Sequence, residues 1–160
     1  MINIKGLTFH QPYASLMGIK TNETRTWYTK YRGQVAIHAG KKNLCKSPFQ
    51  TISLFGTLAK SEYEQLMPII TEGYNLPVGA IVMFADLVYC KKMVGAFTTD
   101  LLREQNSNRL IAIADQTQLE LKLGDWCEGR FAWGFENFRK CDEPIPYKGA
   151  QGLWDYQQEC

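Results

Sequence analysis

The sequence predicts an α+β fold in which a mixed β-barrel is surrounded by short helices. Three observations predict it: several short segments alternate between apolar and polar residues, helical segments are interposed among them, and the two kinds do not alternate strictly. Strict alternation would have indicated a doubly wound parallel sheet. Because the chain has 160 residues and shows no internal repeat or low-complexity linker, we expect one domain spanning residues 1–160.

The N-terminal quarter is predicted to contain a strand, a helix and two further strands, at residues 2–9, 12–18, 23–27 and 34–39. Apolar residues alternate along the first strand, with a bend near Gly6. Pro12 suits the first position of the helix, and Gly18 suits the left-handed conformation that ends it. A turn over residues 29–33 joins the last two strands.

Two inserted helices are predicted next. Ser47-Pro48-Phe49-Gln50 contains a capping serine, a proline at the first helical position and a glutamine three residues after the cap. Ser61-Glu62-Tyr63-Glu64 repeats this capping pattern for the second helix. Pro68 is expected to kink or shorten that helix, because proline lacks the backbone N–H that the helix needs.

The most hydrophobic run, residues 80–89, predicts a buried central strand interrupted by Asp86. We expect Asp86 at a bend near solvent, because unpaired carboxylates are rarely buried; the alternative is that it faces a polar pocket. Thr99 is the predicted cap of a short helix. The polar segment Glu104 to Asn108 is predicted to be a loop.

Two closing strands are predicted at residues 116–121 and 130–137. The second carries three aromatic residues on one face: Phe131, Trp133 and Phe135. Pro144 and Pro146 are expected to prevent regular pairing in the centre of a sheet. The segment through Gly152 should therefore wrap around the outside and bring Trp154 back onto the fold.

Composition narrows the classes of protein that the chain could be. Hydrophobic content of 45% and charged content of 21% are typical of soluble globular proteins, and no apolar run has membrane-spanning length. Without a signal-peptide pattern, a cytoplasmic location is the default expectation. Five cysteines without a C-x-x-C pair indicate reduced thiols, and neither they nor the two histidines have metal-ligand spacing. We expect no metal and no cofactor.

Charge is unevenly distributed, although the net charge is only +2. Between Gly18 and Lys46 there are seven basic residues and a single acidic one, Glu23. An anionic partner such as a phosphate backbone would need this asymmetry on one face of the molecule. The alternative is a solvated lysine-rich loop, because the sequence does not show whether the charges share a face.

The segment from Gly18 to Trp27 is the strongest candidate site. Lys20 follows the predicted helix, and Glu23, Arg25 and Trp27 fall at alternate positions, which on a strand point to one face. A lysine at the mouth and an acid-base pair inside would make a polar pocket. The alternative is a surface turn in which these side chains form exposed ion pairs that contribute little to stability.

Gly18-x-Lys20-x-x-Glu23-x-Arg25 resembles the G-x-K-x-x-E-x-R signature of the ASCH domain family, whose fold is related to the PUA domain. Leu7–Leu16 is similar to the family's L-S-x-x-Q-P-W-A-S-L run, with Tyr13 in place of the commoner tryptophan. Further segments resemble the family in the same order: Tyr31-Arg32-Gly33, Ala36-Ile37-His38-Ala39, and residues 76–82, 129–133 and 148–154. The likeness spans nearly the whole chain.

This resemblance implies a PUA-like pseudobarrel that binds RNA or a nucleotide-like ligand. The binding candidates are Lys20, Glu23, Arg25, Trp27, Tyr31, Arg32, His38 and Gln11. Arginine can grip phosphate or stack on a base, lysine supplies a point charge, and a carboxylate can accept from a base amino group. Trp27, Tyr13 and Tyr31 are the local aromatics on which a base could stack, although packing the barrel rim is their alternative role.

Hydrolysis is the alternative that the resemblance also implies. The family includes a small bacterial amidohydrolase that deacylates N4-acetylcytidine, and other members resemble ribonucleases. In that amidohydrolase, the catalytic group contains the equivalent of Lys20 and a threonine at the position where this chain has Glu23. Glu23 could act as a general base with Lys20 stabilising the oxyanion. For RNA cleavage, His38 or His10 could shuttle a proton. A third alternative is an interaction module in transcription or RNA processing.

Overall fold

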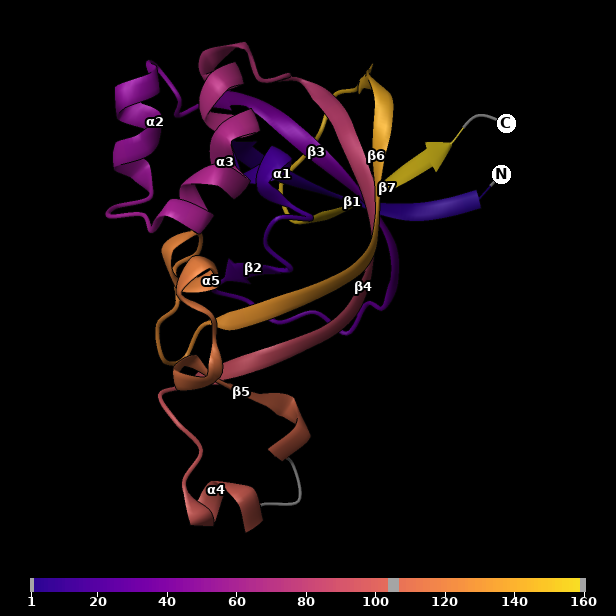
Figure 1. The fold of residues 1–160 in the computed structure, drawn as a ribbon. Coiled ribbons are helices and arrows are strands. Elements are labelled where there is room, and N and C mark those ends of the chain that lie inside the picture. The colour runs from indigo at the N-terminus through magenta and orange to yellow at the C-terminus, as the bar shows by residue number, and fades with distance from the viewer. Residues whose placement is uncertain (1, 104–106, 159–160) are drawn as a thin grey trace.

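The structure is a computed structural model that describes residues 2–103 and 107–158, and Figure 1 shows its fold. Within these ranges the strands are β1 (Ile2–Gln11), β2 (Asn22–Arg25), β3 (Gly33–Asn43), β4 (Ala80–Val94), β5 (Leu110–Ala112), β6 (Phe131–Pro146) and β7 (Leu153–Gln158). The α-helices are α1 (Tyr13–Leu16), α2 (Pro48–Leu54), α3 (Lys60–Glu72), α4 (Thr99–Arg103) and α5 (Gln118–Lys122). Short 3₁₀ helices are η1 (Gly73–Asn75), η2 (Ser107–Arg109) and η3 (Ile113–Asp115).

The strands form one mixed, curved sheet in the order β2-β6-β4-β3-β1-β7, with β5 added beside β4. Strands β1 and β3 run parallel, as do β4 and β5, whereas the other pairs are antiparallel. The ends of this order, β2 and β7, do not pair with each other. The predicted α+β pseudobarrel is therefore confirmed, as a barrel whose sheet is not closed.

The interior of the curved sheet is filled by the strands that the sequence predicts to be buried. Most of β4 is buried between β3 and β6, which confirms the predicted central strand. On β6, Trp133 and Phe135 are fully buried and Phe131 is half-buried, as their alternation predicts. Trp154 of β7 lies against Gly6 of β1, so the C-terminal segment does return onto the fold.

Helices α2 and α3 lie side by side at one edge of the sheet, with α5 next to them (Figure 1). Ser47 caps α2 as predicted, because its side chain accepts a hydrogen bond from Gln50 N at 3.2 Å. The predicted cap at Ser61 is wrong: α3 is capped by Ala59, whose N–H donates to the Glu62 carboxylate at 3.1 Å. This helix also continues through Pro68 to Glu72, so the proline does not shorten it.

Residues 116–121 are the clearest error of the sequence-based prediction, since most of this segment forms helix α5 instead of a strand. Thr117 Oγ1 accepts a hydrogen bond from Glu120 N at 3.2 Å and caps the helix. Leu119 and Leu123 then pack into the apolar cluster beneath α2 and α3. In so short a segment, apolar residues at every second position are compatible with a strand or with a helix. Packing against the neighbouring helices makes this segment helical.

The second correction concerns Pro144 and Pro146, which do not end the pairing of β6. This strand stays paired with β4 as far as Pro146, opposite Ala80, although the register shifts between Lys140 and Ile145. Strand β2 pairs only with residues 131–134 of β6, so the distal part of β6 has a described neighbour on one side only. A proline there can turn its missing N–H away from the ladder, as it does on edge strands.

The remaining predictions concern Asp86, the cap of α4 and the loop 104–108. Asp86 lies at a register shift of β4, is partly exposed and pairs with Arg139 at 3.0 Å, as expected for a carboxylate near solvent. Hydrogen bonds from Arg139 and Asn137 lower the pKa of Asp86. Helix α4 begins at Thr99, but Leu101 N donates to Thr98 Oγ1, so Thr98 supplies the capping oxygen. Of the predicted loop 104–108, residues 104–106 lie outside the described residues.

None of the helices in the described ranges combines the length and the apolar composition that crossing a membrane requires.

Candidate ligand-binding cleft

A cleft of about 530 Å³ opens between β1, α1, β2 and the loop that precedes β7. We call it the Glu23 cleft. Its lining residues are Thr8, Phe9, His10, Tyr13, Glu23, Thr24, Arg25, Trp27, Arg130, Ala150, Gln151 and Gly152. An adjoining hollow of about 430 Å³ shares four of them, Tyr13, Glu23, Thr24 and Arg130, and adds Lys20.

The backbone between α1 and β2 places Lys20 beneath this cleft. Gly18 has a φ of +97°, a conformation that favours glycine, and its N–H donates to Lys20 O at 2.9 Å. The chain therefore turns sharply after α1 and enters β2 at Asn22. Along β2, Glu23 and Arg25 point to one face and both line the cleft, as their alternate spacing predicts.

Lys20 is almost completely buried, with 1% of its side chain exposed. Its Nζ donates to Glu23 Oε2 at 2.9 Å and to Leu123 O at 3.2 Å. The ammonium also lies 5.3 Å from the centre of the Tyr13 ring. A buried charge needs such partners because the interior does not solvate it, so Lys20 is a fixed component of the cleft floor.

Glu23 links this lysine to Arg25. Its Oε1 lies 3.3 Å from Arg25 Nε, and Arg25 Nη2 donates to Thr8 O at 3.0 Å. The guanidinium carbon is 5.2 Å from the centre of the Phe9 ring. Arg25 Nε is buried and makes no hydrogen bond within the described part of the chain. Glu23 and Arg25 thus present an acceptor and a donor side by side at the cleft wall.

Aromatic side chains border these charges. Trp27 packs edge to face on the buried Trp133, with ring centres 4.5 Å apart, and lines the cleft. Tyr13 lies on the other side of Glu23, where burial raises the pKa of its phenol and the negative charge of Glu23 raises it further. Like an ordinary phenol, Tyr13 is protonated at neutral pH, and the raised pKa extends that range upward, so its hydroxyl can donate a hydrogen bond.

Arg130 is a cleft residue that the sequence analysis did not select. Its Nε donates to Asp125 O at 3.1 Å, and its Nη2 donates to Thr24 O at 3.3 Å, so it braces β2 from the side. The signal was present in the sequence, because Arg130 lies in the segment 129–133 that resembles the family. Thr8, Gln151 and the exposed His10 also line the cleft, whereas His10 was considered only for RNA cleavage.

Besides Lys20, which lines only the adjoining hollow, four predicted binding residues do not line the Glu23 cleft. Gln11 is fully buried, and its amide bonds to Ser15 and to Pro77 O, which fixes the start of α1. His38 is buried beneath β7, with Nδ1 3.2 Å from Thr8 Oγ1 and Nε2 2.9 Å from Tyr147 O. Both are held by structural hydrogen bonds.

Tyr31 and Arg32, the other two, lie in the turn that precedes β3. Tyr31 Oη donates to Gln34 O at 2.7 Å, and its ring packs against the core. Arg32 is exposed and donates to Thr29 O at 3.0 Å. The motif order in the sequence does not reveal that this turn lies outside the cleft lining, because the distance between β2 and β3 is set by the sheet.

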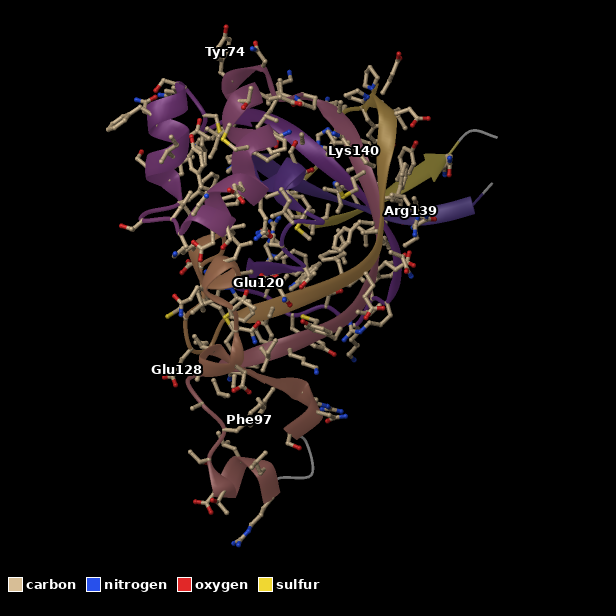
Figure 2. All side chains as sticks on the ribbon, in the orientation of Figure 1. Tyr74, Phe97, Glu120, Glu128, Arg139 and Lys140 are labelled. Atoms are coloured by element: carbon tan, nitrogen blue, oxygen red, sulfur yellow. The ribbon has the colours of Figure 1, made fainter. Side chains whose placement is uncertain are left out.

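A second buried carboxylate supports the site from below. Glu120 Oε1, on α5, accepts from Thr21 N at 2.6 Å and from Thr21 Oγ1 at 3.0 Å (Glu120 is labelled in Figure 2). These bonds hold the turn between Lys20 and β2 against α5. This contact was not predicted from the sequence, because residues 116–121 were expected to form a strand.

Within the described residues, no group of three or more His, Cys, Asp or Glu side chains is arranged to hold a metal ion. The Glu23 cleft offers a carboxylate, two guanidinium groups and the aromatic rings of Phe9, Tyr13 and Trp27, and the buried Lys20 ammonium lies in the adjoining hollow.

Most of the chain is similar in sequence to known proteins. A family model described as "ASCH domain" matches residues 7–144, which include Lys20, Glu23, Arg25 and Arg130. Activating signal cointegrator 1 of Mus musculus is 31% identical over 122 residues, which make up 73% of this chain and 20% of that protein. The chain thus spans about a fifth of the length of this relative.

Proposed function

This chain belongs to the ASCH domain family, and on that premise we propose that it binds RNA or a nucleotide-like ligand in the Glu23 cleft. The ASCH domain is a PUA-like family associated with RNA binding. The observation that carries the proposal is the chain of charges from the buried Lys20 through Glu23 to Arg25, which ends at the wall of an open cleft.

The chemistry of this wall suits a nucleobase edge. Glu23 accepts hydrogen bonds and Arg25 donates them, which is the complement of the amino and carbonyl groups on a base. Trp27 and Tyr13 add aromatic surface, and Arg130 adds a second guanidinium that suits phosphate. The volume of about 530 Å³ lies within the range of small-molecule sites.

Hydrolysis is the second candidate, and one contact favours it. The Lys20 ammonium lies 2.9 Å from Glu23, so a general base and a group that could stabilise an oxyanion stand together at the cleft. The third candidate, an interaction module, is favoured only by the name of the relative, a signal cointegrator five times longer than the matched segment.

Binding can be tested by fluorescence anisotropy with labelled RNA, comparing the chain with its Arg25→Ala variant. We expect Arg25→Ala to weaken binding at least about fivefold, the lower limit for losing one arginine contact to a base or phosphate. The matched control is Arg139→Ala, since Arg139 is an exposed arginine on β6 that pairs with Asp86 outside the cleft (Figure 2). Equal affinity of Arg25→Ala and the unaltered chain would contradict the proposal.

The hydrolase candidate is tested by mass spectrometry of an RNA pool and a panel of N-acylated nucleosides after incubation with the chain. Shortened or deacylated products that disappear with Glu23→Gln would identify a hydrolase. Thermal unfolding of each variant shows whether the loss reflects chemistry or misfolding. Unchanged substrates, together with Arg25-dependent binding, would leave recognition as the function.

A further inference from the structure

A second groove lies beside the Glu23 cleft on the same sheet. It has a volume of about 550 Å³ and is lined by residues from β4, β5, β6 and the segment after β2, among them Tyr28, Lys30, Lys92, Arg109, Leu110 and Phe131. We call it the Tyr28 groove. Among the described residues that line it, three side chains are cationic and none is acidic.

We propose that the Tyr28 groove holds the nucleotide next to the one in the Glu23 cleft, so that the ligand is a single-stranded oligonucleotide. This inference rests on the proposed function of the Glu23 cleft and extends it. It specifies the ligand as a polymer, because a free nucleoside would occupy one site only.

The groove contains an exposed aromatic ring that rests on a second ring. Tyr28 is 49% exposed, an unusual position for a large aromatic ring in a chain that buries Trp133 and Phe135 completely. The Phe131 ring is half-buried beneath it, with ring centres 5.8 Å apart and the planes inclined by 58°. An exposed ring supported by a second ring is the kind of surface on which single-stranded bases stack.

Cationic side chains border these rings. Lys30, Lys92 and Arg109 are all exposed and surround the two rings. Burial raises the pKa of Cys90, which also lines the groove, and the positive charge of Arg32 acts in the opposite direction. Arg32 is therefore close enough to the groove to add to its positive potential. Stacking rings bordered by cations are what a strand of bases and phosphates requires.

The sheet register joins the groove to the cleft. Arg25 of β2 lies opposite Phe131 of β6, and Phe131 lies opposite Lys92 of β4. Residues directly opposite each other share one face of a sheet, so a cleft residue and two groove residues form one row. Adjacent strands are about 4.8 Å apart, which places the backbones of Arg25 and Lys92 about 10 Å from each other. In the chain, Trp27 lines the cleft and the next residue, Tyr28, lines the groove.

An acidic peptide could also meet the three cations, but it would leave the exposed rings without a role. The oligonucleotide uses both the charges and the rings, and it continues into the cleft. The observations therefore favour the oligonucleotide, and the peptide becomes an outcome of the test.

The experiment measures affinity against ligand length by isothermal titration, using uridine monophosphate, oligouridylates of two to eight nucleotides and the matching oligodeoxythymidylates. We expect affinity to rise at least about fivefold when a second nucleotide is added, the lower limit for stacking one base. Tyr28→Ala should abolish this rise and leave binding of the monophosphate unchanged. Tyr28→Phe should retain it, because the ring remains. A rise with either RNA or DNA supports the inference.

Salt dependence tests the cations. Lys30→Ala and Lys92→Ala should each lower the slope of log affinity against log salt by about 0.7, the value for one phosphate contact to a single strand. Lys140→Ala is the matched control. This exposed lysine on β6 is the strand partner of Met83 on β4, and Met83 lies nine residues before Lys92, about 30 Å along the strand. Its slope should equal that of the unaltered chain.

Three results would overturn the inference. If affinity does not depend on length while Arg25→Ala still weakens binding of the monophosphate, the groove proposal fails and the proposed function of the cleft stands. If no oligonucleotide or monophosphate binds, both fail. If a polyglutamate peptide binds in a Tyr28-dependent way and oligonucleotides do not, the groove is a peptide site.

Discussion

Lys20 carries a charge into the interior beside the Glu23 cleft. Its ammonium has two hydrogen-bond acceptors, Glu23 Oε2 and Leu123 O, and the Tyr13 ring faces it from a third direction. Removing one partner of a buried ion pair leaves an uncompensated charge, which costs more than the pair contributes. Glu23 is therefore expected to have a structural role in addition to any role in binding.

We predict that Glu23→Leu lowers the free energy of unfolding by about 3 kcal/mol, because it leaves the Lys20 ammonium buried without a counter-charge. The measurement is the urea unfolding midpoint at pH 7. The double variant Lys20→Met/Glu23→Leu removes both charges and should be more stable than Glu23→Leu alone.

The double-mutant cycle provides the decisive comparison. If the losses of Lys20→Met and Glu23→Leu simply add in the double variant, the two side chains are not coupled and the assignment of Lys20 as a buried partner of Glu23 is wrong.

At the scale of elements, α5 determines where β2 begins. Glu120 on this short helix accepts two hydrogen bonds from Thr21, and Leu123 at its end supplies a carbonyl to Lys20. Lys122 adds an ion pair with Glu62 of α3 at 2.6 Å. The helix thus connects the inserted helices to the floor of the cleft.

Thr117→Ala is predicted to destabilise the protein by about 1 kcal/mol, because it removes the oxygen that caps α5. Unfolding in urea, followed by circular dichroism, measures the loss. Thr117→Ser keeps the hydroxyl and should behave as the unaltered chain does. If both variants lose the same stability, the methyl group of Thr117 matters and the cap does not.

Across the whole molecule, β7 joins the C-terminal segment to β1 and thereby holds the preceding loop, which forms one wall of the cleft. Trp154 Nε1 donates to Thr8 Oγ1 at 3.2 Å, and Thr8 Oγ1 donates to Ala150 O at 3.0 Å. The Trp154 ring also stacks on Tyr147, with ring centres 5.2 Å apart. Residues 150–152, which line the cleft, are therefore positioned by contacts between the two ends of the chain.

Gly6→Ala tests this closure, because a Cβ at Gly6 would lie 2.4 Å from the indole of Trp154. We expect a loss of about 1–3 kcal/mol, typical of overpacking, measured as a lower urea midpoint. The control is Gly40→Ala, whose Cβ would meet the Thr8 methyl group at 3.1 Å and should cost less. Equal losses would show that Trp154 moves aside freely and does not hold β7 in place.

Local sequence patterns were sufficient to predict several features at each of these scales. The alternation of Phe131, Trp133 and Phe135 predicted one buried face of β6, and Ser47 predicted the start of α2. The spacing of Glu23 and Arg25 predicted that both point into the same cleft. Each of these features depends on backbone periodicity or on bonds within a few residues, so the sequence contains the necessary information.

The sequence by itself determined the family, the α+β class and the pairing of Glu23 with Arg25 on one strand face. Only the tertiary structure decided that residues 118–122 form a helix, that His38 lies beneath Trp154 and that Arg130 reaches the cleft. The physical reason is that these three features depend on contacts between residues far apart in the chain. Sheet order and helix packing bring such residues together, and the spacing of residues along the sequence does not specify that order.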